Sequence, residues 1–145
     1  QLREIIQSHG LDGKVVILEN VSRGETLLQF YRGAELFALM SQNLGHDVEG
    51  FGLVFLEAAA SGLPVVGTKD TGIEDAIREG ENGFLVHPRD YKAFASALIR
   101  ILEDEKIKKQ MREASLRLVR AASWEKRIAE YATLYRFVDN SVLMS

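Results

Sequence analysis

Two glutamates flank a short glycine-containing turn, and their types and spacing point more directly to chemistry than any other residues in this chain. The segment from Glu49 to Glu57 reads EGFGLVFLE. Between Gly50 and Val66, Glu57 is the one ionisable side chain, and the other residues are apolar or small. A carboxylate is costly to bury unless hydrogen bonds compensate it, so we expect Glu57 to face a polar ligand or a buried partner. The alternative is a structural role, as a cap or in an ion pair.

The glycines between these glutamates predict a backbone that turns tightly and approaches a ligand closely. Gly50 and Gly52 precede a helix that we expect from about Leu53 to Ser61. The free amide groups at the start of such a helix, together with the positive end of its dipole, hold anions such as a diphosphate. Glycine pairs before helices also occur in ordinary tight turns, so the flanking glutamates give the pattern its weight.

A second polar loop, Thr68–Gly72, reads TKDTG and follows an apolar run. Lys69 could neutralise phosphate, Asp70 could bond a sugar hydroxyl, and Gly72 could allow close backbone approach. A solvated polar loop is the alternative interpretation. His46 is a lone loop histidine, which is more often simply solvated, and we assign it no role.

The elements that would position these loops alternate between strand and helix. Four apolar runs of strand length lack the strict alternation of a half-exposed strand, which is typical of a parallel sheet covered on both faces. We therefore predict an α/β fold with a doubly wound, Rossmann-like sheet and a helix in each crossover. The expected strands are 14–18, 35–40, 64–68 and 84–86, and the expected helices are 2–11, a segment ending near 32, 53–61 and 74–79.

The remainder of the chain reads as helical. Asp90 can cap a helix whose apolar residues Phe94, Leu98, Ile101 and Leu102 have helical spacing. Further helices are expected around residues 107–118 and after a cap at residue 123, with one apolar face each. We thus divide the chain into an α/β part, about 1–88, and a helical tail, 89–145.

Composition excludes several classes of function. The chain has 145 residues, which suits one domain, and a formal net charge of -3 with scattered basic residues, which argues against nucleic-acid binding. It has no cysteine and three widely spaced histidines, so we expect neither disulfides nor metal ligands. The absence of cysteine fits a cytoplasmic location. The longest apolar stretch is interrupted by Glu57, Ser61 and Pro64, so we expect no membrane span.

Three segments, taken in order, resemble one family. The segments EGFGLVFLEAAASGLPVVGT, TGIED and GENGFLV are similar to the C-terminal donor-binding domain of the retaining GT-B glycosyltransferases, the glycosyl transferases group 1 family, which includes glycogen and sucrose synthases. The spacing of the two glutamates matches, and Ser123-Trp124-Glu125 resembles the usual start of the family's last helix. The resemblance covers essentially the whole chain and implies one C-terminal nucleotide-sugar-binding domain, residues 1–145.

The resemblance implies a role for each part of the motif. Glu49 would contact the transferred sugar as the catalytic residue, and Glu57 would hold the two ribose hydroxyls, which supplies the hydrogen-bond donors that its charge requires. The strand-end segment 18–21, ending at Val21, resembles the edge where main-chain groups read the nucleobase, and Gly72 matches the donor-sugar loop. The turn residues whose backbone would contact the donor sugar and diphosphate are Gly50, Phe51, Gly52 and Leu53.

Departures from the family pattern limit what this chain can do alone. Thr71 stands where a glycine is usual, and Glu74 stands where a proline is usual. Two strands that would carry a basic pair for the diphosphate are absent, as is the N-terminal domain with the acceptor site. We expect the two strands to belong between strand 14–18 and the other three, a gap that another chain, a displaced strand or an incomplete chain would explain. Any peripheral membrane contact would then be made through the missing half.

The function implied is transfer of a hexose from a nucleoside diphosphate sugar to a hydroxyl acceptor with retention of configuration. The nucleotide sugar is then a substrate, and the family usually needs neither cofactor nor metal. We expect this chain to be inactive without the other half of the protein. The alternatives are a non-catalytic nucleotide-sugar-binding subunit completed by another chain, and a sugar-nucleotide epimerase of GT-B architecture.

Overall fold

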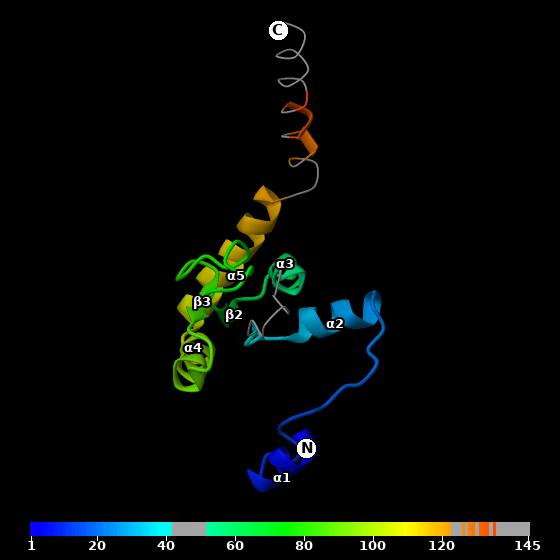
Figure 1. The fold of residues 1–145 in the computed structure, drawn as a ribbon, viewed down its shortest axis with the longest axis vertical. Coiled ribbons are helices and arrows are strands. Elements are labelled where there is room, and N and C mark those ends of the chain that lie inside the picture. The colour runs from blue at the N-terminus through cyan, green and yellow to red at the C-terminus, as the bar shows by residue number, and fades with distance from the viewer. Residues whose placement is uncertain (42–51, 123–125, 127, 130, 134, 136–145) are drawn as a thin grey trace, which may run out of the picture. The chain divides into compact units, whose positions relative to one another are not determined.

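The computed structural model describes residues 1–41, 52–122, 126, 128, 129, 131–133 and 135 (Figure 1). The chain divides into two compact units, Gln1–Phe30 and Tyr31–Ser145. Helix α2, Glu25–Gly33, begins in the first unit and ends in the second.

The first unit contains helix α1, Leu2–Ser8, as predicted, but not the predicted strand over residues 14–18. A strand must pair its backbone N–H and C=O groups with a neighbouring strand. Residues 1–30 contain no strand, so the β-branched run has nothing in this unit to pair with. Its apolar side chains remain exposed, and Val16 is 74% exposed.

The second unit is built on a parallel sheet of three strands in the order β1-β2-β3. The strands are β1, Phe37–Ala38, β2, Val65–Thr68, and β3, Gly83–Val86. The predicted parallel α/β sheet is confirmed, although β1 is shorter than the predicted strand 35–40. Phe37 and Ala38 pair with Val65 and Val66, and Leu39 donates one more backbone hydrogen bond to Val66, at 3.0 Å.

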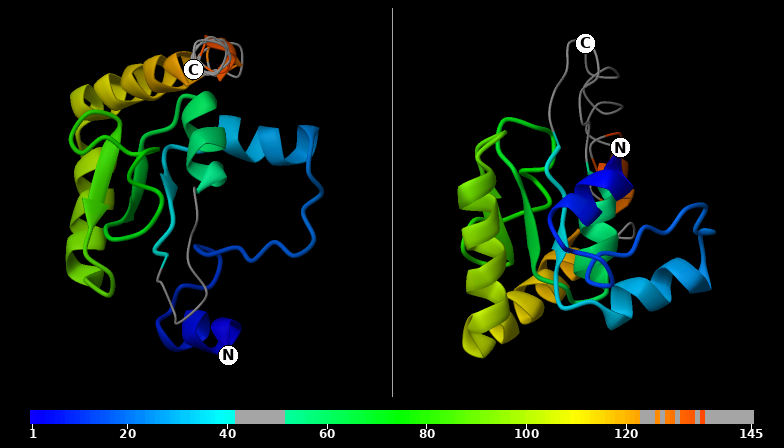
Figure 2. Two further views of the ribbon diagram at one scale, coloured as in Figure 1. Left: turned by 45° about the horizontal axis from the view of Figure 1, so that its top comes forward. Right: turned by 90° about the horizontal axis from the view of Figure 1, so that it is seen from below.

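Neighbouring residues of β2 belong to two separate hydrophobic clusters, one on each face of the sheet, because successive side chains of a strand point to opposite faces. Val65 packs with Phe55 and Ile73 on one face, where helix α3, Leu53–Ala60, lies. Val66 packs with Ile101 and Met111 on the other, from helices α4, Tyr91–Glu103, and α5, Glu105–Ala121. Figure 2 shows α3 and α4 on opposite sides of the strands. Both faces are thus covered, which explains why β2 is buried at every residue.

The helical prediction after residue 88 holds as far as the structure describes it. Asp90 caps α4 by accepting a hydrogen bond from the Ala93 N–H at 2.9 Å, as predicted, and Asp104 caps α5 in the same way through Ile107, at 3.0 Å. Residues 126, 128, 129, 131–133 and 135 are also helical. The predicted cap at residue 123 and the Ser-Trp-Glu motif lie outside the described residues.

The short helix predicted at 74–79 is wrong, because the segment after β2 forms successive turns instead. Within it, the Ala76 N–H donates to the Ile73 carbonyl, three residues earlier, at 2.9 Å, and another backbone donor bonds to a side chain. The Arg78 N–H donates to the Asn82 side-chain oxygen at 2.7 Å, and Asn82 donates in turn to the Ala76 carbonyl at 3.2 Å. The buried Asn82 therefore takes over the hydrogen bonding that a helix would otherwise satisfy.

Two polar contacts attach α5 to the rest of the second unit. The Ser115 hydroxyl donates to the Leu63 carbonyl at 2.6 Å, and both residues are buried. The largely buried Lys108 ammonium lies 2.8 Å from Glu35, just before β1, and 2.6 Å from Glu105. Hydrogen bonding to Lys108, followed by its charge, lowers the pKa of Glu35 below the ordinary 4.5. Hydrogen bonds from Glu105 and then Glu35 raise the pKa of Lys108 above 10.5.

Candidate functional site

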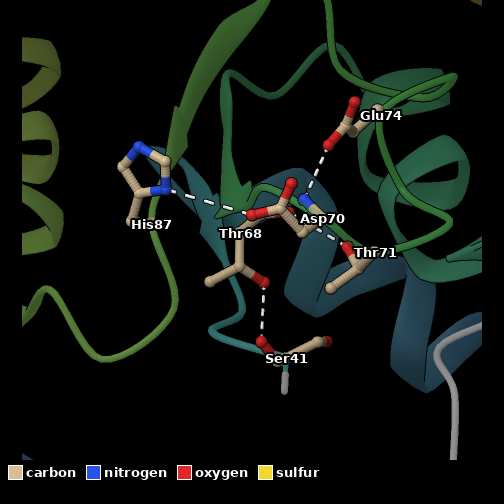
Figure 3. A network of polar contacts seen from close by, with 6 residues as sticks. All are labelled: Ser41, Thr68, Asp70, Thr71, Glu74 and His87. Carbon is tan, nitrogen blue, oxygen red and sulfur yellow. Dashed lines mark hydrogen bonds and ion pairs between the residues drawn. The ribbon is translucent and has the colours of Figure 1, made fainter. Parts of the chain in front are cut away.

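The carboxyl ends of three parallel strands bring polar residues from distant parts of the sequence together. Ser41 follows β1, Thr68 ends β2, and His87 follows β3 (Figure 3). The buried Thr68 hydroxyl donates a hydrogen bond to the Ser41 carbonyl at 2.7 Å, which ties the exits of two strands together. Ligands of open α/β folds bind outside this edge of the sheet.

Gly52 forms the start of α3 in a left-handed conformation, with φ 60° and ψ 47°. Side chains other than glycine rarely adopt this conformation. A Cβ here would also collide with the Ile73 side chain and lie 3.0 Å from the Phe55 ring. The predicted tight turn is confirmed at Gly52, where the close approach is to Ile73. Leu53, the first residue of the helix, is 62% exposed, so the backbone amides of the first turn lie near the surface.

Glu57 is exposed, and the expectation that it is a buried charge is wrong. Helix α3 buries Phe55, Ala58 and Ala59, and Leu53 and Glu57, four residues apart, lie on the other face. The helix consists almost entirely of apolar and small residues, so its sequence gave no periodicity from which the exposed face could be chosen.

Tyr31 is the partner of Glu57, and the sequence analysis missed it. Its hydroxyl donates a hydrogen bond to Glu57 Oε2 at 3.2 Å. Burial raises the pKa of Tyr31 above its ordinary 10.0, and the hydrogen bond and negative charge of Glu57 raise it further. The tyrosine therefore remains a neutral donor that orients the carboxylate, while the carboxylate retains acceptor capacity for further donors.

The loop after β2 is held by a network of hydrogen bonds (Figure 3). The Asp70 N–H donates to Glu74 Oε1 at 2.7 Å, and the Thr71 hydroxyl donates to the Thr68 carbonyl at 3.0 Å. Asp70 Oδ2 lies 4.0 Å from His87 Nδ1. The predicted Gly72 lies half-buried in the turn that follows, and Lys69 is also half-buried.

His87 is a second polar residue at this edge that the sequence analysis missed. A signal was present, because His87 comes directly after the predicted strand 84–86, and the carboxyl ends of parallel strands meet at one edge. The side chain is 71% exposed and points toward Asp70 (Figure 3). It therefore belongs with the loop after β2 and not with a separate cluster.

Some of the predicted site residues lie outside the described residues or in the first unit. Glu49, Gly50 and Phe51 lie outside the described residues, as does His46. Val21 is half-buried in the first unit. Gly52, Leu53, Glu57 and Gly72 all lie in the second unit, and the close approach of Gly52 to Ile73 joins the start of α3 to the loop that carries Gly72.

Within the described part of the chain, no group of three histidine, aspartate or glutamate residues is arranged to hold a metal ion. Among the helices that the structure describes, none has the length and apolar character needed to cross a lipid bilayer.

Comparison with known proteins identifies similar sequences and folds. The chain is 36% identical over 135 residues to a D-inositol 3-phosphate glycosyltransferase from Corynebacterium urealyticum, a match that covers 93% of this chain and 30% of that protein. A sucrose-phosphate synthase from Thermosynechococcus elongatus matches in structure with a TM-score of 0.80 and 28% identity, over 97% of this chain and 34% of that one. Anabaena HepE, solved in complex with UDP and glucose, matches with a TM-score of 0.76 and 25% identity, over 91% and 35%.

These matches agree with the architecture described above. A three-stranded parallel sheet with flanking helices is part of a Rossmann-like domain of the GT-B glycosyltransferases. The chain spans about a third of the length of these proteins. The family description "Glycosyl transferases group 1" matches residues 1–117. The chain belongs to the glycosyl transferases group 1 family.

Proposed function

We propose that this chain is the C-terminal donor-binding domain of a retaining hexosyltransferase, which transfers a hexose from a nucleoside diphosphate sugar to a hydroxyl acceptor. The observation that carries the proposal is the arrangement of α3. An exposed carboxylate, Glu57, lies one turn beyond Leu53 on a helix that starts from the left-handed Gly52. A helix start that tolerates only glycine and a nearby oriented carboxylate suit a diphosphate and a diol.

Each part of the donor molecule has its own proposed contacts. Glu57, oriented by Tyr31, accepts hydrogen bonds from the ribose hydroxyls. Backbone groups of Gly50, Phe51, Gly52 and Leu53 contact the diphosphate and the sugar, and Gly72 lies along the sugar. Glu49 contacts the transferred sugar, and main-chain groups near Val21 read the base. The complex of Anabaena HepE with UDP and glucose supports a nucleotide and a hexose as ligands.

Catalysis in this proposal is electrostatic. Hydrogen-bond donors held in place by the protein stabilise the negative charge that develops on the leaving diphosphate. The acceptor site and part of the cleft belong to a domain outside this chain, and the whole protein works in the cytoplasm. The division of the chain at residue 88 into an α/β part and a helical tail remains part of the same proposal.

Donor binding by the full-length protein tests the assignment of Glu57. UDP, GDP and ADP are titrated by calorimetry, first into the wild type and then into Glu57→Ala. Loss of hydrogen bonds to a charged acceptor should weaken the preferred nucleotide about 10- to 100-fold. Glu113→Ala, which removes an exposed glutamate from α5, is the matched control and should bind like the wild type. Equal affinity of Glu57→Ala and the control would rule out the ribose role.

The stereochemistry needs a separate measurement. The anomeric configuration of the first-formed product is read by NMR during transfer from the preferred donor to a hydroxyl acceptor. The proposal requires the configuration of the donor to be kept. An inverted product would leave donor binding intact but refute retention.

A further inference from the structure

Asp70 has a backbone conformation that needs support. Its φ is 59°, in the left-handed region that side chains other than glycine rarely occupy, although aspartate tolerates it better than most. The residue lies two positions after β2 and two positions before Gly72. The direction of the chain through Thr71 to Gly72 therefore depends on this one conformation.

Glu74 supplies the support in this chain. Its Oε1 accepts a hydrogen bond from the Asp70 N–H at 2.7 Å, a short distance typical of a bond to a charged acceptor. The Thr71 hydroxyl closes the same turn on the Thr68 carbonyl at 3.0 Å. The His87 ring, from the end of β3, lies 4.0 Å from the Asp70 carboxylate, which is beyond hydrogen-bonding distance but close enough for electrostatic attraction when the ring is charged.

The contact through Glu74 is specific to the residue found here. A carboxylate at position 74 can accept the Asp70 N–H, whereas a proline, which has no polar side-chain atom, cannot. Ile73 and Ala76 are fully buried beside it, so the backbone around Glu74 is fixed while its own side chain reaches the surface. The buried neighbours of Glu74 therefore hold its carboxylate in place beside the loop.

We propose that Glu74 is a positioning residue: it holds Asp70 in the left-handed conformation and thereby directs Gly72 toward the sugar of the donor. This inference rests on the proposed function, because Gly72 is assigned to the sugar there. Glu74 acts on the sugar half of the donor and leaves the nucleotide half, bound at α3, unaffected. The substrate class that it helps to select is the hexose portion of a nucleoside diphosphate sugar.

The experiment compares two ligands on the full-length protein. UDP-glucose, GDP-mannose and ADP-glucose are titrated to find the preferred donor, and its parent nucleoside diphosphate is titrated beside it. Glu74→Ala should weaken binding of the sugar nucleotide about 3- to 10-fold, the effect of losing one hydrogen bond, and leave the nucleoside diphosphate unchanged. Glu74→Gln keeps an acceptor oxygen at this position and should recover most of the affinity.

A double-mutant cycle makes the test independent of folding. Glycine adopts the left-handed conformation without support, so Glu74→Ala should have little further effect in a protein that already carries Asp70→Gly. If Glu74→Ala weakens both ligands equally, or weakens the sugar nucleotide by the same factor in both backgrounds, the inference is wrong. If Glu74→Ala binds the sugar nucleotide as tightly as the wild type, it is also wrong. Failure of the wild type to bind any nucleotide sugar would instead refute the proposed function.

Discussion

At the scale of single residues, the candidate site needs glycine at some positions as much as it needs particular side chains at others. Gly52 has two restrictions at once, a left-handed backbone and a side-chain direction blocked by Ile73. Gly80 has the first restriction alone, because its φ is 74° and a Cβ there would meet no heavy atom within 4 Å. Comparing the same substitution at the two glycines thus separates the free-energy cost of backbone strain from that of steric collision.

We predict that Gly52→Ala destabilises the protein by about 2–5 kcal/mol, since it combines the left-handed penalty with overpacking against the core. Gly80→Ala should cost about 1–2 kcal/mol, the left-handed penalty alone. Urea denaturation of both variants and the wild type measures the difference. An equal loss of unfolding free energy in the two variants would show that the loop carrying Ile73 moves aside at little energetic cost.

The residue scale also shows what sequence could not reveal. Glu57 was found from its charge and spacing, but its exposure depends on which face of an almost uniformly apolar helix packs on the sheet. Tyr31 lies 26 residues earlier, and its bond to Glu57 follows from the packing of two separate segments. Such contacts between distant residues leave no local pattern in a single sequence.

At the scale of elements, α5 is attached to the sheet through charge as well as through its apolar face. Lys108 joins the first turn of α5 to Glu35, which stands just before β1 and is 73 residues away in the sequence. The glutamate side chain is 62% exposed, so solvent weakens the interaction. The Lys108 side chain is 10% exposed, and its ammonium also contacts Glu105.

The lowered pKa of Glu35 predicts a pH-dependent contribution to stability. A carboxyl whose pKa is lower in the folded state stabilises the protein above its unfolded pKa, and this contribution disappears as pH falls through the folded value. Glu35→Gln should therefore lower the denaturation midpoint near pH 7, and its effect should shrink as the pH falls below the ordinary pKa of 4.5 and Glu35 becomes protonated in the folded protein. Glu113→Gln, on the exposed face of α5, is the matched control. A loss that persists unchanged in acid would mean that packing, and not charge, explains it.

The elements themselves were predictable where their causes are local. Helices α4 and α5 have aspartate caps and apolar faces of helical spacing, and β2 and β3 are apolar runs bounded by proline, glycine or polar residues. Residues 14–18 have an equally strong strand pattern but form no strand, because strand formation needs a partner that propensity cannot supply. Turns at 72–76 stand in place of the helix predicted at 74–79, where the side chain of the following Asn82 bonds to the backbone of Arg78 and Ala76.

At the scale of the whole molecule, the proposed site would contact only the parts of a donor that α3 and the loop after β2 can reach. The chain covers about a third of the length of its relatives. The family could be read from the motif, since its glycines and glutamates lie close together in the sequence, and the sheet could be read from the apolar runs. The acceptor could not, because nothing in the described part of the chain is assigned to bind it.

We predict that residues 1–145 alone do not transfer sugar, because the acceptor site of the proposed enzyme lies elsewhere. Release of nucleoside diphosphate from UDP-glucose, GDP-mannose and ADP-glucose is measured with the isolated chain and with the full-length protein, each with a hydroxyl acceptor. The full-length protein should turn over its preferred donor, and the isolated chain should stay at background. Sugar transfer by the isolated chain would contradict the division of labour proposed here.

The close approach of Gly52 to Ile73 has a consequence for engineering. The turn proposed for the diphosphate and the loop proposed for the sugar are in contact at Gly52 and Ile73, so a bulkier side chain at either of these two positions would displace both. A library that randomises residues 69–73 to change the donor sugar would select mostly against bulk at position 73, whatever the sugar. Useful diversity should instead be placed at exposed His87, where a new side chain can extend outward without moving α3 or the backbone at Asp70.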